Sequence, residues 1–371
     1  MQQGCQTPSA ACSPTVTVAL DNKGQLWRTF VNGQTLYVQQ RLATGGFAPA
    51  LPVNAVPEAI STHGESRLQL AFGKANRIYL VWVTKGEEHD SHIRFAYSAD
   101  AGKHFSKPVT IEQDRHAAMH NFPALAANAQ GQVFIAWLDM RDTAIAKAAG
   151  KPADHGVTAA VFYNWSDDGG VHFQPQDLRI KSRACLCCHL AMTLDDKGLP
   201  ELLFRDVYPG SERDHSLVTF AAKNKPLAPV RISFGHWQLQ GCPEKGPALW
   251  QQGKRLHLLW FDRNQLFYRH EDAGKLSQVL PVGKSGSARG SMAAADGVLL
   301  MAWQRYSDGA MRVYVQRSRD GGEHFTKPEE VAATQGASDY PQLVGNDKQV
   351  WLSWLTADQG HRLIQLTQEA P

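Results

Sequence analysis

A short hydrophobic run that ends in an aromatic residue recurs seven times along the chain. Most of these runs follow a polar turn such as "DNKG", "NAQG" or "DDKG", as β-strands after a turn do. The runs are "QLWRTF" at 25–30, "RIYLVW" at 77–82, "QVFIAW" at 132–137, "PELLF" at 200–204, "RLHLLW" at 255–260, "VLLMAW" at 298–303 and "QVWLSW" at 349–354.

Each aromatic run has an apolar segment before its turn and another strand-like segment after it. The later segments are "TLYVQQ", "IRFAYS", "AVFYNWS", "SLVTF", "LFYRH", "VYVQRS" and "RLIQLT". Four strands in a repeat of roughly 50 residues is the pattern of a propeller blade. The sequence therefore predicts an all-β fold: one seven-bladed β-propeller over 1–371, built of four-stranded antiparallel blades.

The two ends of the repeat array leave the blade count open to six or eight if an end unit is incomplete. The last repeat shows no fourth strand after "RLIQLT", which makes the tail 1–13 a candidate to complete the last blade. Long helical periodicity is missing; only "TAIAKAAGK" at 143–151 indicates one or two helical turns, inside a loop.

Composition excludes several classes of protein. Hydrophobic residues make up 43% and charged residues 20%, as in an ordinary globular protein. A formal net charge of +3 gives no reason to expect nucleic acid or a membrane surface as a partner. The apolar runs have strand length, so no membrane insertion is expected. Met1 followed by "QQGCQTPSAAC" is typical of a mature start with an added Met, which suggests a periplasmic or secreted protein.

Three of the later strands run into one turn motif, Ser-x-Asp-x-Gly-x-x-Phe. It occurs as "SADAGKHF" at 98–105, "SDDGGVHF" at 166–173 and "SRDGGEHF" at 318–325. The carboxylate in such a turn can accept backbone N–H bonds, and glycine supplies a positive φ. We therefore expect Asp100, Asp168 and Asp320 to be structural rather than catalytic.

This motif resembles the Asp-box, or BNR repeat, of sialidase-like β-propellers. "RACLCCHLAM" at 183–192 and "CPEKGP" at 242–247 make the chain look like a non-sialidase subgroup from bacterial envelopes. The Arg-Ile-Pro of sialidases is missing, because Arg-Ile occurs only as "RIY", "RIK" and "RIS". We therefore expect no turnover of sialosides. Because fold alone does not give function, we assign no catalytic residue.

Propeller topology places the segments that lead into the first strands on one face, at the mouth of the central channel. All six cysteines fall on such segments. Cys5 and Cys12 precede the first blade and are a candidate disulfide. The remaining candidates are Cys185, Cys187, Cys188 and His189 before the fourth blade, Cys242 before the fifth, and Met119 and His120 before the third.

Cysteine, histidine and methionine together suit a soft or borderline metal ion. We expect copper, as Cu(I), with zinc as the alternative, because C-x-C-C-H lacks the paired spacing of zinc fingers. Such a protein would sequester the metal, deliver it or confer tolerance to it. Its expected partners are the metal ion and, as an alternative, a periplasmic protein. A redox or nucleophilic thiol is a further alternative, although no helix N-terminus is expected there to activate it.

Two other functions remain open. A glycan-active hydrolase or lyase would need a close carboxylate pair on the same face, for which Asp139, Asp206 and Asp262 are candidates. A protein-binding scaffold would instead use the cysteines as structural disulfides, with Cys187 or Cys188 joined to Cys242.

Overall fold

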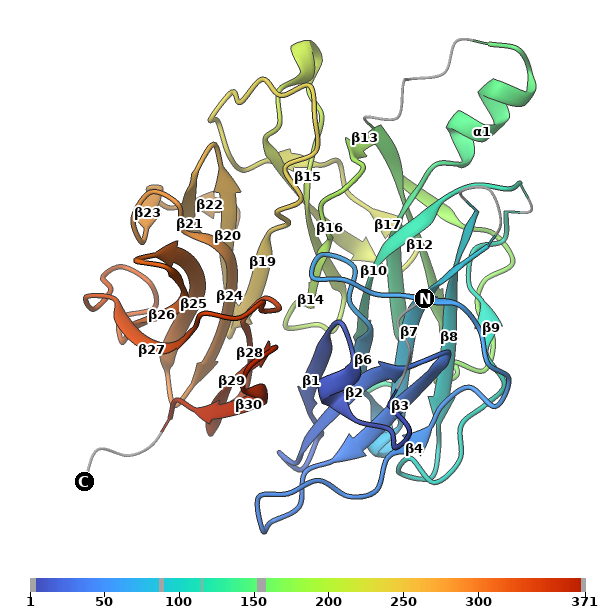
Figure 1. Cartoon of the computed structure of the whole chain (residues 1–371). Coiled ribbons are helices and arrows are strands. Elements are labelled where there is room, and N and C mark those ends of the chain that lie inside the picture. Colours follow the sequence, from blue (N-terminus) through green and yellow to red (C-terminus); the bar gives the residue numbers. More distant parts are fainter. Residues whose placement is uncertain (1–4, 87–89, 115, 152–157, 368–371) are drawn as a thin grey trace.

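The computed structural model describes residues 5–86, 90–114, 116–151 and 158–367. These residues form seven antiparallel sheets that follow one another around a central axis, which confirms the predicted β-propeller (Figure 1). Every sheet grows outward in chain order, from a first strand at the axis to the strands at the rim.

The first four blades contain the following strands. The first blade contains β1 (Val16–Leu20), β2 (Leu26–Asn32), β3 (Thr35–Gln40) and β4 (Leu51–Pro52), and the second contains β5 (Ile60–Ser61), β6 (Gln69–Phe72), β7 (Ile78–Lys85), β8 (Ser91–Ser98) and β9 (Val109–Thr110). The third contains β10 (His120–Ala127), β11 (Val133–Asp139), β12 (Thr158–Ser166) and β13 (Leu178–Cys185). The fourth contains β14 (Ala191–Leu194), β15 (Pro200–Arg205), β16 (His215–Ala222), β17 (Lys225–Pro226) and β18 (Val230–Arg231).

The last three blades follow the same plan. The fifth blade contains β19 (Ala248–Gln252), β20 (Arg255–Asp262), β21 (Gln265–Asp272), β22 (Lys275–Leu276) and β23 (Leu280–Val282). The sixth contains β24 (Ala288–Ala295), β25 (Val298–Ser307), β26 (Ala310–Ser318) and β27 (Glu329–Thr334). The seventh contains β28 (Gln342–Asn346), β29 (Gln349–Thr356) and β30 (Gly360–Gln365). Short 3-10 turns lie at Ala10–Cys12 (η1), Lys74–Asn76 (η2) and Pro209–Ser211 (η3).

The ring is closed by its first strands. β1, β6, β10, β14, β19, β24 and β28 contact one another in chain order, and β28 contacts β1. Among the described residues the seventh blade has three strands. η1 contacts both β2 and β30, and its Ala10 joins an apolar cluster with Trp351, so the tail packs between the first and last blades.

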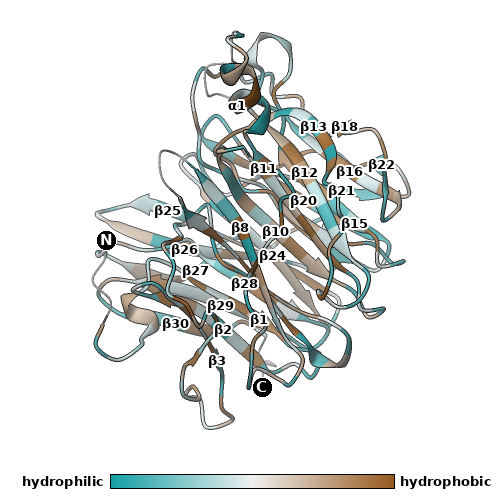
Figure 2. Cartoon of the chain, turned by 90° about the vertical axis from the view of Figure 1, so that its right-hand side faces the viewer, coloured by the Kyte–Doolittle hydropathy of each residue, from teal (hydrophilic) through white to brown (hydrophobic). Residues whose placement is uncertain are grey.

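The seven repeated aromatics occupy second strands and hold neighbouring blades together. Each is at most 3% exposed and lies in an apolar cluster with residues of the preceding blade. They are Phe30, Trp82, Trp137, Phe204, Trp260, Trp303 and Trp354. Figure 2 shows hydrophobic segments along strands such as β12 and β20, and many hydrophilic connecting loops. The repeat visible in the sequence is therefore the repeat of the interface between blades.

The three Ser-x-Asp turns share one set of contacts. In the turn after β12, Asp168 Oδ1 accepts hydrogen bonds from Ser166 Oγ at 2.8 Å and from the His172 amide at 2.9 Å. The Gly170 amide donates to Ser166 Oγ at 2.9 Å, with φ +84 at this glycine. Asp100 and Asp320 make the same contacts, so these carboxylates are used within their own turns.

The predicted helical turns are present as α1 (Arg141–Ala148), which begins two residues before the alanine-rich segment. In Figure 1, α1 projects from the upper end of the molecule, in the connection between β11 and β12. Within the described parts of the chain, no helix has the length and apolar character needed to cross a membrane.

Candidate functional site

The mouth of the central channel carries an ion network that joins four blades. Glu65 of the second blade, whose side chain is 1% exposed, is its centre. Glu65 Oε2 accepts hydrogen bonds from His189 Nδ1 at 2.8 Å and from the Gly246 amide at 2.9 Å. Arg289 of the sixth blade pairs with the other oxygen and lies over the Tyr340 ring, 3.8 Å from its centroid. The carboxylate of Glu65 thus ties its own segment to segments of three other blades that are distant in sequence.

Irregular first strands bring these side chains to the mouth. The first strand of the second blade is split into β5 and β6, which pair with different parts of β7, and 62–68 with Glu65 leaves the ladder between them. Arg289 lies in a bulge of β24 with φ +60, a left-handed conformation that costs energy. A Cβ at position 246 would lie 2.4 Å from His189 Nδ1, so glycine is required for its amide to reach Glu65.

The network fixes the charges of its members. His189 Nε2 is 2.8 Å from the Pro247 carbonyl, and both its partners only accept, so both ring nitrogens carry protons. Burial lowers the pKa of His189, but Glu65 and the Pro247 carbonyl outweigh burial and raise this pKa. Burial raises the pKa of Glu65, whereas the charges and hydrogen bonds of His189 and Arg289 outweigh it and lower this pKa to about 2.

Behind the network lies a cavity of about 330 Å³ in the channel. First strands and lead-in segments of six of the seven blades line it. Its polar and aromatic lining includes Arg67, Gln69, Trp250, Tyr340 and Gln342. Arg67 is held by Asp339 at 2.6 Å, so this charge is balanced within the wall.

Three thiols gather between the third and fourth blades. Cys185 ends β13, while Cys187 and Cys188 lie in the turn before β14. Cys185 Sγ is 3.8 Å from Cys187 Sγ and 3.5 Å from Cys188 Sγ. Cys185 and Cys188 are each 1% exposed, and Cys187 is partly exposed. We call these three residues the thiol triad.

The protonation of the thiol triad is uneven. Hydrogen bonds from Cys187 and Cys188, helped by the positive charge of Arg205, lower the pKa of Cys185. The hydrogen bond to Cys185 raises the pKa of Cys187, and burial raises that of Cys188. Arg205 is itself 1% exposed in β15, and it donates to the Phe261 carbonyl at 2.5 Å. Among the three sulfurs, these shifts favour Cys185 as the one that loses its proton first, beside the buried cation of Arg205.

The structure does not bring the other predicted ligands into the thiol triad. Among the described residues, the ligand atoms grouped within 4.8 Å of one another there are the three sulfurs alone. Cys242 is a free, exposed thiol, and His189 is committed to Glu65 and Pro247. His120 belongs to an acidic cluster in the third blade, and the Met119 carbonyl accepts from the amide of Met140 at 2.9 Å.

The other cysteine and carboxylate candidates have separate places. The sulfurs of Cys5 and Cys12 lie within disulfide-bonding distance, with Cα atoms 6.0 Å apart. Asp139 is paired with Arg141 at 2.5 Å, and Asp206 with Lys181 at 3.1 Å. Asp262 lies against Gly235, where a Cβ would be 1.6 Å from its Oδ2. These carboxylates are buried, and among described residues no group of close ligand atoms joins any two of them.

Sequence reasoning missed Glu65 and Arg289, and also Asp114, which lies beside His120 in the acidic cluster of the third blade. Glu65 and Arg289 lie where first strands are split or bulged, and "HGESR" and "GSARGS" carry no strand alternation to signal this. The glycines in these segments were the available signal, since a glycine next to a strand often marks a bulge or a break in the ladder.

The sequence matches no protein-family model and no curated protein. Comparison with solved structures places it beside propellers at 11 to 13% identity. A microbial sialidase, Hz136, matches with a TM-score of 0.55 over 92% of this chain and 73% of its own. The BP39L lectin of Burkholderia pseudomallei matches with a TM-score of 0.64 over 95% and 98%. A PL25 ulvan lyase matches with a TM-score of 0.60 over 98% and 94%. At this identity the matches show the fold alone, a β-propeller.

Proposed function

We propose that this protein binds one Cu(I) ion through Cys185, Cys187 and Cys188, and that it sequesters, delivers or detoxifies copper. The observation that carries the proposal is the separation of the sulfurs, 3.5 and 3.8 Å. Two thiolates that bind one ion at about 2.3 Å with tetrahedral to trigonal angles lie about 3.8 to 4.0 Å apart. Small movements would bring the thiol triad to this geometry.

Copper(I) suits the triad better than zinc. Zinc in structural sites takes four ligands, and the described residues add no nitrogen or carboxylate oxygen to the three sulfurs. Soft thiolates select Cu(I). The buried Arg205 favours thiolates, and a bound ion would replace the thiol protons of the triad.

The cellular setting that we propose is the bacterial envelope, periplasmic or secreted. The Cys5–Cys12 pair at disulfide distance supports an oxidising compartment, where such bonds persist. The shared contacts of the turns at Asp100, Asp168 and Asp320 support their assignment as Asp-box turns. The free state of Cys187, Cys188 and Cys242 argues against the scaffold hypothesis with structural disulfides.

Copper titration tests the proposal directly. Reduced apoprotein, titrated with Cu(I) against a colorimetric chelator, should bind one ion per chain. Because two thiols must lose protons, binding should release about two protons per ion near neutral pH. Calorimetry in buffers of different ionisation enthalpy measures that number. Absence of saturable binding to reduced protein, with the thiol triad shown to be free by mass spectrometry, would refute the proposal.

Saccharide binding is the second candidate function. The observation in its favour is the channel cavity of about 330 Å³, which presents Trp250 and Tyr340 beside arginine and glutamine side chains. Aromatic faces with a few convergent polar groups are typical of small-molecule sites. Proteins described as a sialidase, a lectin and an ulvan lyase share the fold.

We expect no hydrolysis of sialosides by this protein. The sialidase Arg-Ile-Pro is missing, and the buried Asp139 and Asp206 are committed to neighbouring cations. Incubation with a chromogenic sialoside should therefore release no aglycone above the rate without protein. Release that Asp262→Asn abolishes would contradict this expectation and would assign Asp262 a catalytic role.

A further inference from the structure

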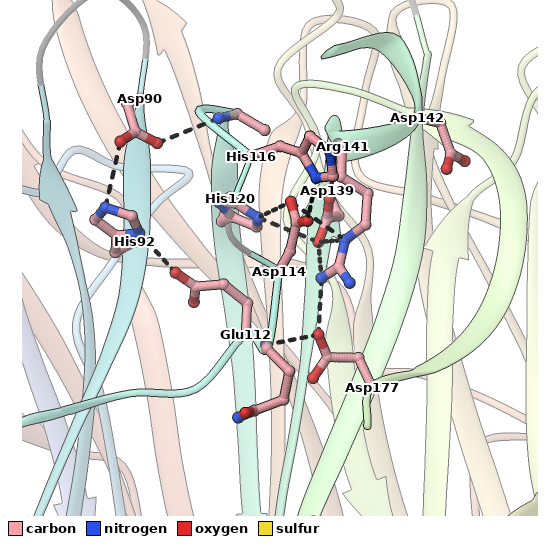
Figure 3. A network of polar contacts seen from close by, with 12 residues as sticks. Asp90, His92, Glu112, Asp114, His116, His120, Asp139, Arg141, Asp142 and Asp177 are labelled. Carbon is pink, nitrogen blue, oxygen red and sulfur yellow. Dashed lines mark hydrogen bonds and ion pairs between the residues drawn. The ribbon is translucent and has the colours of Figure 1, made fainter. Parts of the chain in front are cut away.

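A second group of close ligand atoms lies in the third blade, away from the thiol triad. His120 opens β10 and Asp139 ends β11, and the two are directly paired across the ladder. Asp114 comes from the segment between β9 and β10. Figure 3 shows the three side chains converging, and their ligand atoms lie within 4.8 Å of one another. We call these residues the blade 3 cluster.

The tautomer of His120 is fixed by its backbone partner. His120 Nδ1 is 2.7 Å from the Ser91 carbonyl, which only accepts, so Nδ1 carries the proton. In the neutral ring the Nε2 lone pair is then free. The side chain is fully buried, and Nε2 has no hydrogen-bond partner among the residues that the structure describes. Histidines that bind metals commonly donate their other N–H in this way.

The free nitrogen faces two carboxylates. His120 Nε2 lies 3.5 Å from Asp139 Oδ2 and 3.7 Å from Asp114 Oδ2. The Nε2 lone pair and the two carboxylates are all hydrogen-bond acceptors. They repel one another unless a proton or a cation lies between them. The separations are long for N–H···O bonds, which are about 2.7–3.2 Å. Ligands bound tetrahedrally at about 2.0–2.2 Å are about 3.3–3.6 Å apart, which matches better.

The surroundings of the cluster orient its carboxylates. One guanidinium, that of Arg141, faces Asp139 at 2.5 Å, Asp177 at 2.9 Å and Asp114 at 3.9 Å. His116 Nδ1 is 2.7 Å from Asp114 Oδ1, and Trp137 donates to Asp139 Oδ2 at 2.8 Å. Figure 3 shows Arg141 between the carboxylates, so an ion would share Asp139 with it.

We infer that Asp114, His120 and Asp139 bind one divalent cation of the zinc or manganese class. One imidazole and two carboxylates are borderline and hard ligands, unlike the thiolates proposed for copper. The ion would link the connection after β9 to both inner strands of the third blade. The inference is independent of the copper proposal, since the two groups share no residue.

Manganese provides a probe that does not respond to the thiol triad, because hard Mn(II) prefers oxygen and nitrogen ligands. Chelator-treated full-length protein is titrated with Mn(II) by electron paramagnetic resonance, and Zn(II) is then added as a competitor. We expect one bound Mn(II) per chain, displaced by Zn(II). Asp114→Asn should reduce the affinity for Mn(II) by about 100-fold or more. This exceeds the loss that is typical when a residue hydrogen-bonded to a metal ligand is replaced. His120→Asn is the second variant.

The matched control is His236→Asn, in the exposed group of Glu212, Asp214 and His236. It should leave Mn(II) binding unchanged. Circular dichroism confirms that each variant is folded, and Asp114→Asn alone suffices if His120→Asn does not fold. Absence of saturable binding to folded wild type would overturn the inference, as would equal binding by wild type and Asp114→Asn. Loss of binding in His236→Asn alone would overturn it too, since the ion would then occupy the exposed group.

Discussion

Replacing Cys188 by serine is expected to weaken Cu(I) binding by at least about 100-fold. Loss of a residue that only hydrogen-bonds to a metal ligand costs up to about that much, and loss of a ligand itself should cost more. Cys188 is 1% exposed and its sulfur is 3.5 Å from that of Cys185, so the substitution removes one of the three sulfurs of a largely buried site. The hydroxyl of serine is a hard ligand that Cu(I) does not favour. Competition with a Cu(I) chelator of known affinity measures the change.

Cys242→Ser is the matched control, because Cys242 is an exposed thiol outside the triad. It should bind Cu(I) like the wild type. If Cys242→Ser weakens binding as much as Cys188→Ser, the metal site includes the lead-in to the fifth blade and the three-sulfur proposal is wrong. If reductant alone lowers the melting temperature and Cu(I) changes nothing in either protein, the cysteines act as a disulfide instead.

The fold was predictable because the repeat is local. A second strand that ends in a buried aromatic is visible in any single repeat, and Trp82, Trp137 and Trp303 all occupy that position. Propeller topology then orders the blades without long-range information. The packing of η1 between β2 and β30 is different, since it depends on contacts between the two ends of the chain.

The candidate sites were only partly predictable. Proximity in sequence placed Cys185, Cys187 and Cys188 together, and the structure does bring their sulfurs together. Topology placed His189 and Cys242 on the same face, but a shared face does not fix which side chains touch. His189 turns to Glu65, a partner 124 residues away that lies in a split strand. Without a strand pattern in "HGESR", no sequence signal connects the two.

Replacing Glu65 by glutamine is expected to lower the free energy of unfolding by about 3 kcal/mol, the lower end of the cost of breaking a buried ion pair. The lower end applies because His189 is partly exposed and water can solvate its charge, whereas Arg289 stays largely buried. Urea denaturation measures the change. Glu330→Gln, which breaks the exposed pair with Arg312, is the control and should cost at most about 1 kcal/mol.

The same variant should change how stability depends on pH. The pKa of Glu65 is lowered from 4.5 to about 2, so its contribution is complete above pH 4.5 and is lost as the pH falls toward 2. The pKa of His189 is raised from 6.5, so its contribution is complete below pH 6.5 and is lost as the pH rises through the raised value. The difference in unfolding free energy between wild type and Glu65→Gln should therefore be largest between pH 4.5 and 6.5. A difference that stays constant from pH 3 to 9 would show that Glu65 acts through packing rather than charge.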